Sequence, residues 1–378
     1  MTVLADQILA EVLTVGEELL SRRAGAPVAL SDPEDLGGSG RSTVIRARVS
    51  ENTLTPDRTV VVKALGDGAP AGPFLREVAA YRYATALPSG SQPGPQLLAV
   101  DTDTRVLVLT DLGDGRSMVA LLDEDADDAA RGVSAWGQAL GRMHAATLGG
   151  EGDFDALLRR TTGRYEPHGD EVARQAHAGV RAADRIADRL GIAVPERLAA
   201  ELRAGAELFA EGDHRAFSPS DVGPENILLN DEGVQFMDYE HAAFRDAALD
   251  VAYALATFPV YLDESTVSHR EELETSLVDA WRSEVQALWP DLGSDARVAR
   301  QILAARTLWV WLSTYWMIEG GETGPGGQGS DWALHTGDAR VVLTRWADLA
   351  DAAQRAGDVE LRDQAETLER ALRVFWFD

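Results

Sequence analysis

The segment from residue 218 to residue 240 carries three side chains whose types and spacing could do chemistry together. It reads Ser-Pro-Ser-Asp-Val-Gly-Pro-Glu-Asn-Ile-Leu-Leu-Asn-Asp-Glu-Gly-Val-Gln-Phe-Met-Asp-Tyr-Glu, and the three are Asp221, Asn226 and Asp238. Carboxylate and amide oxygens grouped in this way suit Mg²⁺ that carries substrate phosphates. The loop carboxylate of Asp221 is placed to orient a hydroxyl group. The segment therefore predicts a magnesium site that takes a phosphorylated substrate.

A short hairpin is the element that must bring these side chains together. We expect strands at Ile227–Asn230 and Val234–Asp238, paired around the turn between them. In the register that we predict, Asn226 faces Asp238 across the hairpin, and Asp221 lies one loop upstream. The same spacing could also arise by chance in a chain with 62 acidic residues.

Lysine 63 is a second candidate, because it is the only lysine in a chain whose 35 basic residues are otherwise arginine. It ends the β-branched run of a predicted strand at Thr59–Leu65. Glu77 follows fourteen residues later on a helix predicted over residues 74–87. A lysine is a compact ammonium group on a flexible stem, which arginine does not replace. The plain alternatives are a lysine that keeps an edge strand soluble and a glutamate on a solvated helix face.

A glycine-rich segment precedes the first strand that we predict, at residues 44–49. Glycines let backbone N–H groups approach anionic oxygens, and a serine hydroxyl can add a further donor. Taken alone, such a segment is more often a turn than a phosphate site. The candidate residues are Gly37, Gly38, Ser39, Gly40 and Ser42.

The elements around these candidates change character near residue 112. Before it we expect a helix over residues 4–20, a turn at residues 31–35, and short strands at residues 97–100 and 105–109 in addition to those above. After it amphipathic helices dominate, at about residues 129–148, 170–190, 196–210, 270–288, 296–318 and from 338 to the end. We therefore expect an α+β chain with two lobes, residues 1–111 and residues 112–378.

Composition excludes several classes of function. The 35 basic and 62 acidic residues give a net charge of −27, which argues against nucleic acid and against anionic membranes as partners. The chain has no cysteine, so disulfides, thiol nucleophiles and cysteine-bound zinc are excluded. The first residues lack the basic region of a secretory signal, and no apolar stretch is long enough for a membrane span. We therefore expect a cytoplasmic protein.

In their order, these motifs resemble the phosphotransfer core of the protein-kinase-like superfamily, and within it the aminoglycoside phosphotransferase and choline kinase relatives. The family pattern is Asp, four residues, Asn, a hairpin, and then Asp followed by an aromatic residue and Glu. The resemblance implies a two-lobed kinase-like fold, with Asp221 as catalytic base and Asn226 and Asp238 as magnesium ligands. It also implies that Lys63, held by Glu77, reaches the phosphates of ATP.

The resemblance extends to segments on either side. The glycine-rich segment occupies the position of the family's phosphate-covering loop, and residues 106–113 resemble the hinge that pairs with adenine, here through Thr110 and Leu112. Asp250 resembles the residue that braces the catalytic loop. The family often has His two residues before the catalytic Asp, where this chain has Pro219. His168-Gly-Asp170 has the family's usual letters, but Gln175 stands five residues later, so we interpret it as the start of a helix.

The function implied is transfer of the γ-phosphoryl group from ATP, with Mg²⁺, to a hydroxyl of an aminoglycoside, an amino sugar or a related small acceptor. A cationic acceptor would fit the negative chain. The candidate carboxylates are Glu240, Glu319, Glu322 and Asp331, although an ordinary acidic surface explains the last three as well. The alternative from another class is a non-catalytic, pseudokinase-like nucleotide-binding module. The sequence does not indicate an oligomeric state.

Some remaining features have mainly structural interpretations. His144 falls on an apolar helix face, which favours a packed core histidine over a ligand. The aromatic residues Trp309, Trp311, Tyr315 and Trp316 are expected in a helical core. The Gly-rich stretch at residues 320–330 is either an inert surface loop or a loop that closes over the acceptor.

Overall fold

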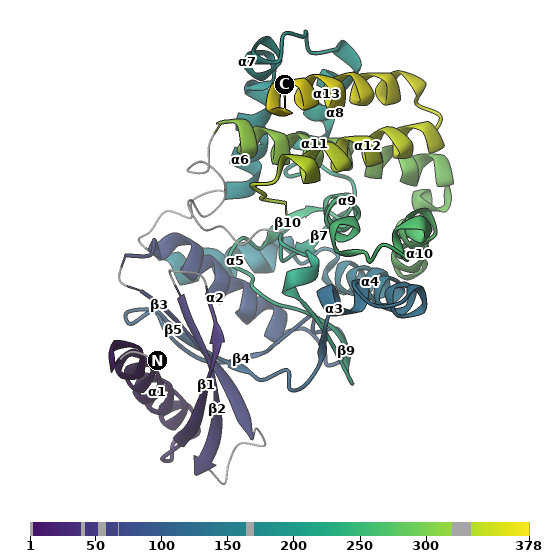
Figure 1. The fold of residues 1–378 in the computed structure, drawn as a ribbon. Helices are drawn as coiled ribbons and strands as arrows, with labels where there is room; N and C mark the ends of the chain where they lie inside the picture. Colours follow the sequence, from purple (N-terminus) through teal and green to yellow (C-terminus); the bar gives the residue numbers. More distant parts are fainter. Residues whose placement is uncertain are drawn as a thin grey trace.

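The structure, a computed structural model, describes residues 3–38, 42–51, 58–66, 68–163, 170–319 and 334–377. Figure 1 shows two parts, a sheet with its flanking helices formed by the N-terminal residues and a mostly helical part formed by the rest of the chain. The α+β fold with two lobes that we expected is confirmed. The exact boundary between residues 111 and 112 stays a prediction.

Five antiparallel strands form the sheet, in the order β1-β2-β3-β5-β4. They are β1 (Ala29–Gly37), β2 (Ser42–Glu51), β3 (Thr59–Leu65), β4 (Leu97–Asp101) and β5 (Val106–Thr110). The turn expected at residues 31–35 is wrong, because these residues belong to β1. That strand is exposed over most of its length and its pairing with β2 shifts register, so it lacks the alternation of a half-buried strand.

The two faces of the sheet pack against different helices. Helix α1 (Val3–Ala24) covers one face, where Val60 and Val62 of β3 are buried in a small separate core. Successive side chains of a strand point to opposite faces. Lys63 therefore lies on the other face, which helix α2 (Ala71–Thr85) covers with the residues of the main core.

The helical part contains the predicted helices, but residues 118–122, 151–162 and 248–257 are also helical although no helix range was predicted there, and two of the predicted helices are divided. Its helices are α3 (Met118–Leu122), α4 (Ala126–Thr147), α5 (Glu151–Thr162), α6 (Glu171–Arg181), α7 (Ala183–Arg189), α8 (Glu196–Glu207), α9 (Ala248–Thr257), α10 (Arg270–Val285), α11 (Asp295–Glu319), α12 (Ala339–Arg355) and α13 (Val359–Phe377). The helix expected over residues 170–190 is two helices, interrupted at Ala182. The last stretch is also two helices, because Gly357 leaves helical geometry with φ 77°.

The aromatic core that we expected on α11 is confirmed. Trp309, Trp311 and Trp316 are each 1% exposed. The indole N–H groups of Trp309 and Trp311 donate to the backbone carbonyls of Leu249 and Gly179, each at 2.8 Å. These contacts fix α11 against α9 and α6. Within the described parts of the chain, none of the helices has the length and apolar composition that a membrane span requires.

Short strands of the helical part form two small sheets, in the orders β10-β7 and β6-β8-β9. They are β6 (Arg116–Ser117), β7 (Arg215–Ser218), β8 (Ile227–Asn230), β9 (Gly233–Phe236) and β10 (Ala243–Asp246). Asn230 pairs with Gly233, so the predicted register was wrong by one residue and Asn226 does not pair with Asp238. The turn therefore has two residues, Asp231 and Glu232, where we assumed three.

Candidate active site

A cavity of about 250 Å³ lies between residues of the sheet part and residues of the helical part. It brings together residues that are far apart in the sequence, including most of the predicted site. Its lining comprises Gly38, Ser42, Val44, Lys63, Leu65, Ala69, Pro70, Pro73, Pro219, Asp221, Asn226, Asp238, Glu240 and His241. The structure therefore places the predicted phosphate-binding, catalytic and magnesium-binding side chains around one space.

Lys63 joins the two parts of the molecule at this cavity. Its ammonium Nζ donates to Oε1 of Glu77 at 2.7 Å and to Oδ1 of Asp238 at 3.0 Å. The strand pairing of β3 with β2 and β5 fixes the position of Lys63, and the buried face of α2 carries Glu77. The Lys63–Glu77 pair expected from the sequence is thus formed in the structure.

The charges of this cluster do not balance. Burial alone would lower the pKa of Lys63, but the carboxylates of Asp238 and Glu77 together raise it. Burial raises the pKa of Glu77, although the ammonium of Lys63 opposes that change. One cation thus faces two carboxylates, with Glu240 adding a third negative charge nearby. A cluster with surplus negative charge is suited to a cationic ligand.

Asp221 is held on one oxygen and is buried, with 6% of its surface exposed. Its Oδ1 accepts a hydrogen bond from the hydroxyl of Tyr253 at 2.7 Å and one from the backbone N–H of Gly223 at 3.3 Å. Burial raises the pKa of Asp221 to about 8, although the Tyr253 hydrogen bond opposes the shift. A buried carboxylate of this kind is a stronger base than an exposed one.

The side chains of Asn226 and Asp238 fit the expected magnesium ion by the chemistry of their donor atoms. The amide Nδ2 of Asn226 donates to the backbone carbonyl of Asp221 at 3.4 Å, which leaves the amide oxygen to accept a cation. Among the described residues there is no cluster of three or more His, Asp or Glu side chains that could enclose a metal. Mg²⁺ is commonly held by one or two protein oxygens together with substrate phosphates, so this sparse set suits it.

Two residues at this place have a strained backbone. Ser220 and Asp238 have φ of 84° and 58°, in the left-handed region that non-glycine residues rarely adopt. Each such residue costs on the order of 1–3 kcal/mol and persists only where its surroundings enforce it. One strained residue directly precedes the candidate base, and the other is itself a candidate metal ligand.

A chain of buried hydrogen bonds supports the loop before Asp221. The backbone N–H of Ser220 donates to Oγ of Ser218 at 3.0 Å, and this Oγ donates to Oδ1 of Asp250 at 2.6 Å. The other oxygen of Asp250 lies 3.1 Å from Nε2 of His144. Trp281 donates to the remaining nitrogen of His144 at 3.0 Å. Because an indole N–H can only donate, His144 must carry its proton on Nε2 and donate to Asp250.

His144 is therefore a packed core histidine, as we expected. Its hydrogen bonds with Asp250 and Trp281 were not predicted from the sequence. Asp250 contacts the loop through Ser218, next to Pro219, where the family often has a histidine. Tyr253 is a site residue that the sequence analysis missed. It lies three residues after Asp250 on α9, which is one helical turn, so this spacing was the signal that could have found it.

The predicted hinge residues lie apart from this cavity. The hydroxyl of Thr110 accepts a hydrogen bond from the backbone N–H of Gln96 at 2.9 Å, and the carbonyl of Leu112 accepts one from the side chain of Asn230 at 2.9 Å. Thr110 and Leu112 instead line a second cavity of about 770 Å³, together with residues of the β8–β9 hairpin. Their contact with adenine stays a prediction.

The remaining predicted residues either do not line the cavity or fall outside the described residues. Glu319 pairs with Arg185 at 2.7 Å and with Arg189 at 3.6 Å, and it does not line the cavity that holds Asp221. Gly37 ends β1 with φ 91°, also outside the cavity lining. Ser39, Gly40, Glu322, Asp331 and the stretch 320–330 lie outside the described residues, as do His168 and Gly169. Asp170 caps the start of α6, as we interpreted it.

Known proteins of similar structure are phosphotransferases of small molecules by their names. The choline kinase of Cryptosporidium parvum is 12% identical, with a TM-score of 0.49 over 89% of this chain and 93% of that one. The ethanolamine kinase of Plasmodium vivax is 9% identical, with a TM-score of 0.48 over 91% and 83%. A thermostable mutant of the aminoglycoside phosphotransferase APH(4)-Ia, in complex with ADP and hygromycin B, is 14% identical, with a TM-score of 0.45 over 94% and 98%.

Similarities this weak do not identify an acceptor. A search of curated proteins found no match to the sequence. The family model of the phosphotransferase enzymes, in contrast, matches residues 45–284, which is more than half of the chain and includes Lys63, Asp221, Asn226 and Asp238. The chain therefore belongs to the phosphotransferase enzyme family and acts on a hydroxyl acceptor.

Proposed function

We propose that this enzyme transfers the γ-phosphoryl group of ATP to a hydroxyl of an aminoglycoside, an amino sugar or a related small, cationic molecule. The observation that carries the proposal is the single cavity around which Lys63, Asp221, Asn226 and Asp238 meet. These four side chains supply a phosphate-binding cation, a base and two oxygen ligands. In-line phosphoryl transfer needs little more from a protein than this positioning and charge.

Each side chain has one role in the proposal. Lys63, steadied by Glu77, binds the phosphates of the nucleotide. Asn226 and Asp238 hold Mg²⁺, which when bound neutralises negative charge on the transferring phosphate. Asp221 accepts the proton of the acceptor hydroxyl through the carboxylate oxygen that Tyr253 and Gly223 do not hold. The raised pKa of Asp221, about 8, supports its role as a base.

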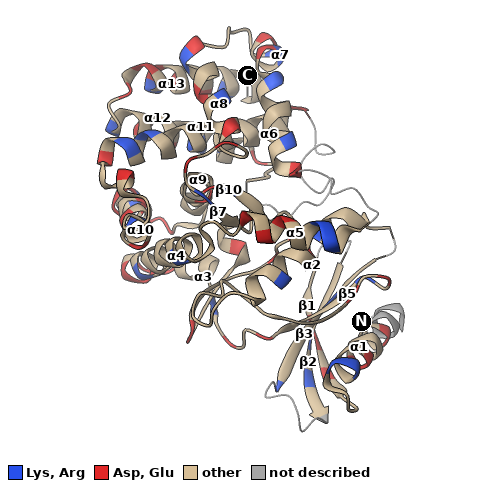
Figure 2. Cartoon of the chain, turned by 180° about the vertical axis from the view of Figure 1, so that it is seen from behind, with Lys and Arg blue, Asp and Glu red and all other residues tan. Residues whose placement is uncertain are grey.

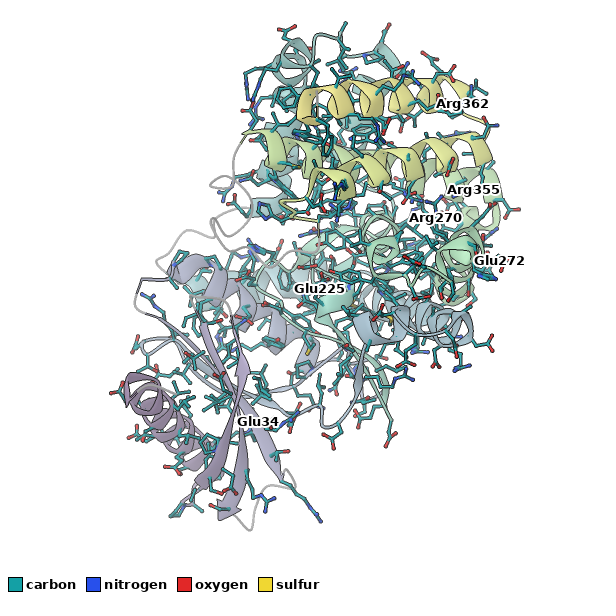
Figure 3. All side chains as sticks on the ribbon, in the orientation of Figure 1. Glu34, Glu225, Arg270, Glu272, Arg355 and Arg362 are labelled. Carbon is teal, nitrogen blue, oxygen red and sulfur yellow. The ribbon has the colours of Figure 1, made fainter. Side chains whose placement is uncertain are left out.

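The proposed preference for a cationic acceptor rests on the carboxylates near Asp221. Glu240 lines the cavity, and Glu225, four residues after Asp221, is exposed at the junction of the two parts (Figure 3). Acidic residues also lie on both parts of the molecule (Figure 2), in agreement with the net charge of −27. A field of this sign attracts an ammonium-bearing substrate.

The alternative is a non-catalytic nucleotide-binding module. Such a module has no need to keep a base, two metal ligands and a phosphate-binding lysine together. Their convergence on one cavity favours catalysis.

A panel assay tests the proposal. ADP release from Mg·ATP is measured with hygromycin B, kanamycin, glucosamine, choline and ethanolamine, and with water alone. We expect at least one ammonium-bearing alcohol to raise the rate above that with water. Asp221→Asn is expected to lower kcat by at least ~10²-fold, the usual effect of losing a general base. Unchanged turnover in that variant would remove Asp221 from the mechanism, and ATP binding without any turnover would favour the non-catalytic module.

A further inference from the structure

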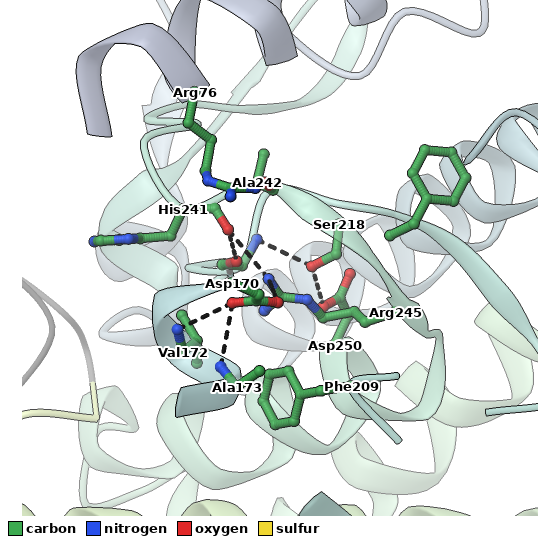
Figure 4. Close-up of polar contacts among 12 residues, drawn as sticks. Arg76, Asp170, Val172, Ala173, Phe209, Ser218, His241, Ala242, Arg245 and Asp250 are labelled. Carbon is green, nitrogen blue, oxygen red and sulfur yellow. Dashed lines mark hydrogen bonds and ion pairs between the residues drawn. The ribbon is translucent and has the colours of Figure 1, made fainter. Parts of the chain in front are cut away.

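Two arginines hold consecutive backbone carbonyls in the segment after Asp238. Arg245 on β10 donates from Nη2 to the carbonyl of His241 at 3.1 Å, and Arg76 on α2 donates from Nη1 to that of Ala242 at 3.1 Å. In Figure 4 the two guanidinium groups approach this segment from different sides. The segment is thus held from both parts of the molecule.

The carbonyl of His241 also holds the loop that carries Asp221. The hydroxyl of Ser220 donates to it, so the two lone pairs of this oxygen take one donor from Ser220 and one from Arg245. Ser220 directly precedes Asp221 and has the left-handed φ of 84°. A hydrogen bond on its side chain is therefore suited to keep the strained backbone, and with it the direction of Asp221, in place.

Burying the charged side chain of Arg245 costs free energy, so stability alone does not explain this residue. It is 1% exposed, lies over the ring of Phe209 at 5.1 Å, and donates to the carboxylate Oδ2 of Asp170 at 2.9 Å. Its Nε and Nη1 have no hydrogen-bond partner among the described residues. An apolar side chain of similar volume would avoid the cost of burying this charge. The hydrogen bond to the carbonyl of His241 is a role for the guanidinium group that an apolar side chain could not fill.

We infer that Arg245, with Asp170 as its counter-charge, is a positioning residue for phosphoryl transfer. It holds the carbonyl of His241, which holds Ser220, which sets the orientation of the Asp221 carboxylate. The inference rests on the proposed role of Asp221, but it does not depend on which acceptor the enzyme uses.

Two single variants test the two ends of this chain of contacts. Ser220→Gly removes the hydroxyl while glycine adopts the same φ without strain, and Arg245→Met removes the guanidinium while filling similar space. Turnover is measured as ADP release from Mg·ATP, with the best acceptor of the panel and with water. We expect each variant to lower kcat on the order of 10-fold and to leave KM for ATP within about twofold, because a misdirected base slows the reaction without changing nucleotide binding.

The double variant gives the sharper test. Because both changes act through the carbonyl of His241, the double variant Ser220→Gly, Arg245→Met is expected to be no slower than the slower single variant. A kcat reduced by the product of the two single effects would overturn the inference. Hydrogen–deuterium exchange of the peptide 217–226 is expected to rise in both single variants.

Control variants distinguish an effect of Arg245→Met on the orientation of Asp221 from a general loss of stability. Arg306 is another buried arginine whose Nε has no hydrogen-bond partner among the residues that the structure describes. Arg306→Met is expected to lower Tm without changing kcat or exchange in peptide 217–226. If Arg245→Met does not fold, Asp170→Asn replaces it, since asparagine keeps the cap of α6 but lacks the charge. Full turnover in Ser220→Gly and Asp170→Asn would refute the inference. Should Asp221→Asn also retain full turnover, the proposed function fails instead.

Discussion

Two buried glutamates, Glu77 and Glu274, differ in the positive charge that surrounds them. Glu77 in the candidate active site is 1% exposed, and Lys63, its cationic partner among the described residues, is shared with Asp238. Glu274 on α10 is 5% exposed, and it faces Arg306 at 2.8 Å, together with Arg270 and Arg355. Figure 3 labels the last two arginines near α10 and α12.

The pKa values of the two glutamates move in opposite directions for this reason. At Glu77 burial prevails and raises the pKa. At Glu274 the three arginines overcome burial and lower it. The cluster around Glu274 is complete without a ligand and serves the packing of α10, α11 and α12. The cluster around Glu77 has surplus negative charge, which a bound cation would balance, as the proposed function requires.

The largest effect that we expect is on stability, at Glu274. Glu274→Gln leaves three arginines around a neutral side chain, and breaking a buried ion pair in this way costs roughly 3–5 kcal/mol. The loss in the free energy of unfolding is measured by urea denaturation. Glu77→Gln should cost less, because burial already disfavours its charge. A larger loss for Glu77→Gln than for Glu274→Gln would contradict the comparison.

The next effect is on activity, at Lys63. Lys63→Met removes the cation that we propose binds the nucleotide phosphates, and turnover is expected to fall by at least ~10²-fold, as for loss of a preorganised charge. The fold should persist, since the raised pKa of Glu77 lets that side chain take up a proton. Steady-state kinetics and circular dichroism measure the two quantities. Retained turnover would remove Lys63 from the site.

A pH titration of stability sharpens the contrast. The pKa of Glu274 is lowered from its ordinary value of 4.5, so its stabilising contribution is complete above that pH and is lost as the pH falls below it. We expect the Tm difference between the wild type and Glu274→Gln to shrink between about pH 5 and pH 3. A difference that stays constant over this range would show that the carboxylate charge is not the stabilising group.

The smallest effect concerns Glu319, which we considered as an acceptor-binding carboxylate. Its partner Arg185 has 59% of its side chain exposed, and such ion pairs contribute about 0.2–1 kcal/mol. Glu319→Gln is therefore expected to change Tm little and to leave KM for the acceptor unchanged. Glu240→Gln is the comparison, with an expected rise in that KM. A raised KM in Glu319→Gln would restore its predicted role.

The parts of the site that the sequence predicted are those whose spacing is set locally. Asp221 and Asn226 share one loop, Asp238 follows a hairpin, and Lys63 and Glu77 lie on a strand and the helix that follows it. The exact register of the hairpin was not predictable from the strand pattern alone, because the sequence of residues 230–234 is compatible with a two-residue turn and with a three-residue turn. In the structure Asn230 pairs with Gly233, which leaves the two-residue turn.

Other features depend on long-range packing and left no sequence pattern. Strand β1 is exposed and irregular, so its residues resemble a turn. The contact of Asp170 with Arg245 joins residues 75 positions apart, and no periodicity marks such a pair. The hydrogen bond of Tyr253 to Asp221 depends on the packing of α9 against the loop. The spacing of one helical turn from Asp250 marks Tyr253 as a candidate, but it does not give this contact. These contacts follow from how α6, α9 and β10 pack, which the sequence does not specify by local rules.

The single lysine has a practical consequence. Its side chain is 13% exposed and ion-paired inside the cavity, while every other basic side chain is an arginine. Reagents that acylate or reductively alkylate primary amines therefore find no second side-chain target. Slow modification of one residue, blocked by added nucleotide and counted by mass spectrometry, would report directly on occupancy of the cleft.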